Sequence, residues 1–196
     1  MPWPVVSRPS RPTADRILLV WLDVLAMRTI ESLYFGDVSS KIENAHRLHR
    51  ELGARLRADQ EIQKSLGRLL QLEKKVAEAM RSMGMFELCA ECGDQPAGGC
   101  CSAKMANETD SMLLLINLIT GFEVSRKRDD GYECCFLGSE GCSLKFKPFY
   151  CLNYLCRQVY TDSSSEQIDR LQDATGELLS QLVLVEELLK RELLAE

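Results

Sequence analysis

The feature that most constrains this chain is the clustering of its cysteines. All nine fall within the 68 residues from Cys89 to Cys156, in a chain of 196 residues. A metal site and a disulfide framework are the two kinds of structure that produce such a cluster. The number of cysteines is odd, so they cannot all pair in disulfides within the chain. In addition, Met1-Pro2-Trp3-Pro4 does not resemble the start of a secretory signal peptide. We therefore expect metal binding in a cytoplasmic protein, with disulfides as the alternative.

Composition and charge narrow the class of protein further. Hydrophobic residues make up 45% of the chain and aromatic residues only 7%, which favours a Leu-rich helical protein. The formal net charge of −5 argues against a broad nucleic-acid-binding surface. The apolar run Ile17–Met27 contains Asp23 and is too short to span a bilayer. We expect neither a nucleic-acid partner nor a membrane span.

The hydrophobic pattern predicts a mostly α-helical fold. A flexible Pro-rich arm is predicted over residues 1–12, followed by N-terminal helices over 13–84. The N-terminal helices comprise a first helix over 13–35 and one long helix over 40–83. A C-terminal helix is predicted over 163–196. Its apolar residues follow a strict 3,4 spacing: Ile168, Leu171, Thr175, Leu178, Leu182, Val185 and Leu189.

The apolar stripe of the C-terminal helix needs a partner, because an isolated amphipathic helix is not stable in water. Residues 38–88 carry ten basic and seven acidic side chains, whereas 157–196 carry four basic and nine acidic. We therefore predict that 163–196 packs antiparallel on 40–83 as a coiled-coil-like stalk. A small cysteine-rich metal-binding domain, residues 85–158, would lie at its tip. A homodimeric coiled coil is the alternative.

Short elements are predicted between the long helices. A helix is expected over Leu113–Ile119. Phe122–Arg128 and Tyr132–Leu137 resemble two strands joined by the turn Asp129–Gly131, and Gly138–Gly141 is a second tight turn.

The cysteine spacing is compatible with either of two metal groups. Cys89-x2-Cys92 is a knuckle that folds two sulfurs toward one centre. Zinc and a [4Fe–4S] cluster both take four thiolates, so ligand type alone does not distinguish them. Either site carries a formal charge near −2, which Lys145, Lys147 and Arg157 can offset from among the later cysteines.

The later cysteines also carry a resemblance to a known family. Cys135-Phe136-Leu137-Gly138, Gly141-Cys142-Ser143-Leu144 and Lys147-Pro148-Phe149-Tyr150-Cys151 resemble the motifs of the YkgJ-type cysteine-cluster family, a zinc- or iron-chelating domain. The resemblance covers about residues 86–158. It departs from the family at the first knuckle, where seven residues rather than two precede Cys100. It implies metal binding and says little about biological role.

The resemblance implies a ligand set. Position by position it matches Cys89, Cys92, Cys100, Cys101, Cys135, Cys142 and Cys151. Cys156 is additional and can complete an eighth ligand. Cys134 is predicted to stay outside the set as a small buried residue, because adjacent side chains on a strand point to opposite faces.

No catalytic constellation is visible. The two histidines, His46 and His49, lie on one predicted helix, and there is no phosphate-binding glycine loop. We predict a metal-binding protein that is redox-active or otherwise related to clusters. The alternative is a structural metal site in a helical scaffold that binds a protein partner or self-associates through its helices.

Overall fold

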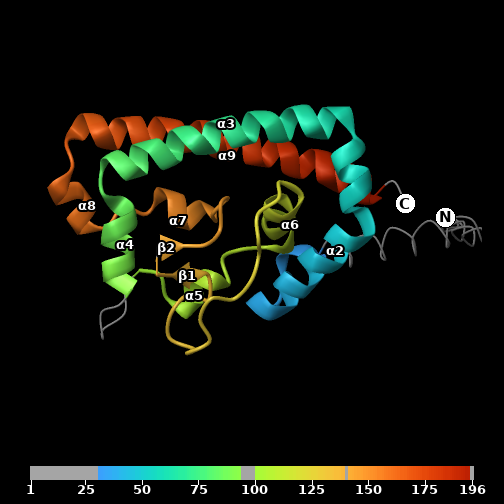
Figure 1. The fold of residues 1–196 in the computed structure, drawn as a ribbon, viewed down its shortest axis with the longest axis horizontal. Helices are drawn as coiled ribbons and strands as arrows, with labels where there is room; N and C mark the ends of the chain where they lie inside the picture. Colours follow the sequence, from blue (N-terminus) through green and yellow to red (C-terminus); the bar gives the residue numbers. More distant parts are fainter. Residues whose placement is uncertain (1–30, 94–99, 140, 195–196) are drawn as a thin grey trace, which may run out of the picture. The chain divides into compact units, whose positions relative to one another are not determined.

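The computed structural model describes residues 31–93, 100–139 and 141–194, apart from the side chain of Cys92 (Figure 1). The chain divides into two units, Met1–Ser32 and Leu33–Glu196. Everything below concerns the second unit. The predicted Pro-rich arm, the apolar run and most of the first predicted helix lie outside the described residues.

The described part of the chain is mostly helical, which confirms the predicted fold class. The helices are α2 (Val38–Ala58), α3 (Gln60–Ser82), α4 (Met85–Gly93), α5 (Ala103–Ala106), α6 (Ser111–Ile119), α7 (Phe149–Asn153), α8 (Arg157–Asp162) and α9 (Ser165–Leu194). Two short strands, β1 (Leu137–Gly138) and β2 (Gly141–Cys142), pair antiparallel with Leu137 opposite Cys142. Helix α6 lies where a short helix was predicted.

The prediction of one long helix over residues 40–83 is wrong. The chain leaves the helical conformation at Asp59, whose φ of −71° and ψ of 125° are extended. The Asp59 carboxylate accepts a hydrogen bond of 2.9 Å from the backbone N–H of Ile62, so this residue ends α2 and caps α3. Aspartate is a strong N-cap residue because its side chain satisfies an otherwise unpaired helix amide.

Helices α3 and α9 pack side by side and antiparallel (Figure 1). The direction follows from contacts at both ends: Arg191 pairs with Glu61 at 2.7 Å, and Lys75 pairs with Glu177 at 3.2 Å. These ion pairs are exposed and contribute at most about 1 kcal/mol each. The larger contribution comes from the apolar seam, where buried residues of α3 meet those of α9. On α9 the buried residues are Leu171, Thr175, Leu178, Leu182, Val185 and Leu189, as the 3,4 spacing predicted.

The C-terminal helix packs mainly on α3 and also contacts α6 and α7, while α2 packs mainly against α6. Helix α6 is buried on nearly all sides, which its run of apolar residues explains. Its N-cap is Asp110, whose carboxylate accepts a hydrogen bond of 2.7 Å from the backbone N–H of Leu113.

The cysteine-bearing segments share the core of the two long helices. Phe146, Leu152 and Leu155 belong to the same buried apolar cluster as the α3 and α9 seam. Glu73, the residue that interrupts the apolar stripe of α3, is buried and pairs with Lys145 at 2.7 Å. A separate stalk with the cysteine domain at its tip is not confirmed, because one core joins both parts.

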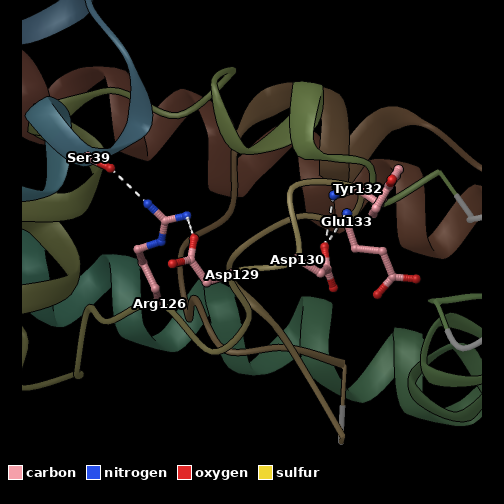
Figure 2. Close-up of polar contacts among 6 residues, drawn as sticks. All are labelled: Ser39, Arg126, Asp129, Asp130, Tyr132 and Glu133. Carbon is pink, nitrogen blue, oxygen red and sulfur yellow. Dashed lines mark hydrogen bonds and ion pairs between the residues drawn. The ribbon is translucent and has the colours of Figure 1, made fainter.

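The predicted strands Phe122–Arg128 and Tyr132–Leu137 do not form. Figure 2 shows a local turn between them, in which the Asp130 carboxylate accepts hydrogen bonds from the backbone N–H groups of Tyr132 (2.8 Å) and Glu133 (3.0 Å). Such a local turn competes with strand pairing. The hairpin forms instead around the second predicted turn, between β1 and β2.

The same loop is tied to α2 by Arg126. Its guanidinium donates a hydrogen bond of 2.8 Å to the Ser39 hydroxyl and pairs with the Asp129 carboxylate (Figure 2). The loop before Cys134 and Cys135 is therefore anchored to the helical scaffold.

A buried asparagine joins α6 to the segment that carries the later cysteines. The Asn117 amide group donates to the carbonyls of Leu113 (2.9 Å) and Phe146 (3.0 Å). Its oxygen accepts from the backbone N–H groups of Lys145 (2.9 Å) and Phe146 (3.0 Å). All four hydrogen-bonding positions of the side chain are used, which is what a buried amide requires.

We predict that Asn117→Ala lowers the free energy of unfolding by about 3 kcal/mol, because it leaves buried backbone groups of Lys145 and Phe146 unpaired. Chemical denaturation measures this change. Asn153→Ala is the matched control: that side chain is exposed and donates only to the Phe149 carbonyl of its own helix. Its effect should stay within about 0.5 kcal/mol. Equal effects of the two substitutions would contradict the anchoring role of Asn117.

Candidate metal centre

Cysteines from five separate segments meet beside the end of α3. Cys89 lies on α4, Cys100 and Cys101 precede α5, Cys134 precedes β1, Cys142 ends β2, and Cys151 lies on α7. Backbone pairing brings the second and third of these segments together. The Cys134 N–H donates to the Cys101 carbonyl at 2.8 Å, and the Ala103 N–H donates to the Tyr132 carbonyl at 2.9 Å.

The glycine that opens β2 permits the tight turn between β1 and β2. Gly141 has a φ of 90°, a conformation that residues with a Cβ rarely adopt. A Cβ at this position would lie 3.8 Å from the backbone oxygen of Phe86. The hairpin can therefore turn tightly and place Cys142 against the helix that carries Cys89.

The six cysteines line one cavity of about 350 Å³. The rest of its wall is apolar or aromatic, apart from one lysine: Met80, Met85, Phe86, Met105, Leu137, Gly141, Lys147, Tyr150 and Tyr154. A volume of this size is at the lower end of the range of small-molecule and cofactor sites. The thiols therefore surround a space large enough for a group of several atoms.

In the described residues, no three His, Cys, Asp or Glu side chains are grouped closely enough to hold a single metal ion. None of the eight cysteines whose side chains are described is in a disulfide.

The structure brings together five of the cysteines expected as ligands, namely Cys89, Cys100, Cys101, Cys142 and Cys151. It adds Cys134, which sequence reasoning placed outside the set. Alternation along an extended segment separates Cys134 from Cys135 but does not say which of them faces the site. The sequence contains no other signal that would have found Cys134.

Two of the described cysteines that were expected as ligands, Cys135 and Cys156, are not among the residues that line the cavity. Cys135 is buried in a second apolar cluster with Val124 and Phe136. Cys156 lies at the N-terminus of α8, half-buried against the main core. Cys92 is on α4, but its side chain lies outside the described residues.

Of the three basic residues expected to offset the charge of the site, only Lys147 lines the cavity. Lys145 pairs with Glu73 instead. The two histidines also have other partners: His46 Nε2 lies 2.8 Å from the Val124 carbonyl oxygen, and His49 Nε2 lies 2.8 Å from the Arg57 guanidinium.

The pKa values of four of the cavity thiols, those of Cys101, Cys134, Cys142 and Cys151, are raised, which favours their protonated forms in the metal-free protein. Burial raises the pKa of Cys134 to about 11 and, together with the neighbouring Cys142 and Cys134 sulfurs, that of Cys151 to about 12. The pKa of Cys142 is also raised by burial, while Lys147 opposes the shift. For Cys101 the largest cause is a hydrogen bond with the Cys100 side chain, and burial adds to it.

These shifts have one chemical consequence. The thiolate is the form that binds metal, so a metal cation must displace protons from these groups on binding. The cation also supplies the positive charge that buried thiolates lack.

No protein-family model matches the chain, no curated protein matches its sequence, and no solved structure matches its fold. Among the described helices, none is both long and apolar enough to cross a membrane.

In metal-free protein, we predict that alkylation of Cys134 and Cys151 accelerates about tenfold per pH unit between about pH 7 and 9.5. The thiolate fraction grows in this way at every pH below the pKa. An ordinary thiol, with a pKa of about 8.5, levels off above about pH 9. Peptide mapping by mass spectrometry after timed iodoacetamide treatment measures the two rates. A plateau near pH 9 for either residue would contradict its raised pKa.

Proposed function

We propose that this protein binds an iron–sulfur cluster of the [4Fe–4S] class in the cavity lined by Cys89, Cys100, Cys101, Cys134, Cys142 and Cys151. The observation that carries the proposal is the convergence of six thiols from five segments on one cavity of about 350 Å³. Four thiolates suffice for such a cluster, and the group supplies one-electron transfer when bound.

The size of the cavity favours a cluster over a single zinc ion. Tetrahedral zinc draws four sulfurs to about 2.3 Å from the metal, which places them about 3.8 Å apart. A cluster spreads its ligands around a core of several atoms, with one thiolate on each iron. Six cysteines around a space of cofactor size fit the second arrangement better. The apolar wall of Met80, Met85 and Phe86 would shield the cluster from water.

The resemblance to the YkgJ-type cysteine-cluster family supports metal binding in general, and the cavity includes Cys142 and Cys151 from its more specific half. Among the cysteines whose side chains are described, the proposal differs from the ligand set predicted from the sequence in two respects. Cys134 takes the place of Cys135, and Cys156 is not a ligand.

The alternative function is a structural metal site in a helical protein that binds a partner or a second copy through its helices. Val183 and Leu184 are exposed on α9, which favours some association through this helix. In this alternative the metal holds the short segments in place and does not change oxidation state. Both proposals include a cytoplasmic location, and neither assigns a catalytic residue.

Anaerobic purification followed by absorption spectroscopy and metal analysis tests the function. We expect a broad absorbance near ~400 nm with iron and acid-labile sulfide, as thiolate-bound clusters show. Colourless protein with stoichiometric zinc would favour the structural alternative. Protein that takes up neither metal, even after anaerobic reconstitution with reduced thiols, would contradict both.

Adjacent cysteines provide a matched test of the ligand set. Cys134 and Cys135 are both buried, so replacing either by alanine removes a similar amount of packed volume. We predict that Cys134→Ala reduces iron content at least twofold, whereas Cys135→Ala retains the wild-type content. Inductively coupled plasma mass spectrometry of the reconstituted proteins measures the difference. The reverse result would restore Cys135 to the site.

Cys142→Ala and Cys151→Ala are predicted to abolish metal retention, because these residues line the cavity from β2 and α7. Cys156→Ala should retain metal. Full occupancy in Cys142→Ala or Cys151→Ala would remove that residue from the ligand set.

A further inference from the structure

Lys147 places a positive charge in the wall of the candidate metal centre. Of the basic side chains that the structure describes, it is the one that lines the cavity. Its Nζ lies 5.7 Å from the centre of the Phe86 ring, which belongs to α4 and also lines the cavity. The Asn117 amide anchors the preceding residue, Phe146, through both its N–H and its carbonyl. The lysine is therefore held near the cavity by the anchored residue before it and by the contact of its ammonium group with the Phe86 ring.

The neighbouring Lys145 is placed differently. Its Nζ lies 2.7 Å from the buried Glu73 carboxylate and 5.7 Å from the centre of the Phe122 ring. A carboxylate at that distance balances its charge. Lys147 instead lines the same cavity as Cys142 and Cys151, so its positive charge is placed among the thiols.

We infer that the positive charge of Lys147 raises the reduction potential of the cluster bound in this cavity. The inference rests on the proposed function. A cluster with four thiolate ligands is negatively charged, and reduction adds one more negative charge. A cation in the wall of a water-poor cavity stabilises the reduced form more than the oxidised form, because the Coulomb energy grows with the charge of the cluster. Without this cation the cluster accepts an electron less readily.

The test compares midpoint potentials of full-length proteins reconstituted anaerobically with iron and sulfide. Lys147→Met removes the charge and keeps an apolar stem of similar length, whereas Lys147→Arg keeps the charge. Arg81→Gln is the matched control: the Arg81 guanidinium lies 5.8 Å from the centre of the same Phe86 ring, but Arg81 is exposed and does not line the cavity. It removes one positive charge and one contact to Phe86.

We expect a more negative potential for Lys147→Met than for wild type, with Lys147→Arg and Arg81→Gln close to wild type. Lys147→Gln serves as the second neutral variant if Lys147→Met does not accumulate. Loss of the cluster from both neutral variants, with normal content in Lys147→Arg, would contradict the inference, because the charge would then serve to retain the cluster and not to set its potential.

Two other results would also overturn the inference. One is an unchanged potential in the neutral variants, and the other is a shift in Arg81→Gln as large as that in Lys147→Met. A wild-type protein without iron contradicts the proposed function itself. If the wild-type protein binds a cluster and all variants have the same midpoint potential, only the proposed role of Lys147 is contradicted.

Discussion

The apolar seam between α3 and α9 is the interaction on which the rest of the structure depends. Buried residues such as Leu69 on α3 and Val185 on α9 each contribute roughly 1.5 to 3 kcal/mol through removal from water. The exposed ion pairs along the same helices contribute far less. The seam supplies the surface against which the other elements are placed. Met80, near its end, is part of the cavity wall.

The segments that carry the cysteines are too short to be stable without that surface. Helix α7 has five residues and each strand has two. Elements of this length do not form in water by themselves. They are held by Leu152 and Leu155 in the main core and by the four hydrogen bonds of Asn117. A bound metal group would add links among the same segments, so metal binding and folding would be coupled.

The two charged side chains that are buried in the described residues, Lys41 and Glu73, have polar partners. Glu73 pairs with Lys145, and the buried Lys41 donates a hydrogen bond of 2.7 Å to the Asn107 carbonyl. The cavity thiols differ, because without metal they avoid the cost of burial by keeping their protons. That difference is what makes the cavity a candidate site for a cation rather than an ordinary part of the core.

The sequence by itself determined the features that depend on local pattern. The 3,4 spacing defined the buried face of α9, the apolar run defined α6, and the cysteine motifs placed Cys142 and Cys151 together. The break at Asp59 was not predictable in this way, because an aspartate in a helical pattern can lie on the helix surface or cap a new helix. Only the packing of α2 on α6 and of α3 on α9 decides between them.

The choice between Cys134 and Cys135 also required the tertiary structure. The two side chains separate to opposite faces in any extended segment, but which face meets the other cysteines depends on how that segment pairs with Cys101. Asn117 is a similar case, since within an apolar run it gives no sign of the backbone groups it will bind. Local periodicity specifies the elements and their buried faces, and long-range pairing specifies which side chains share a site.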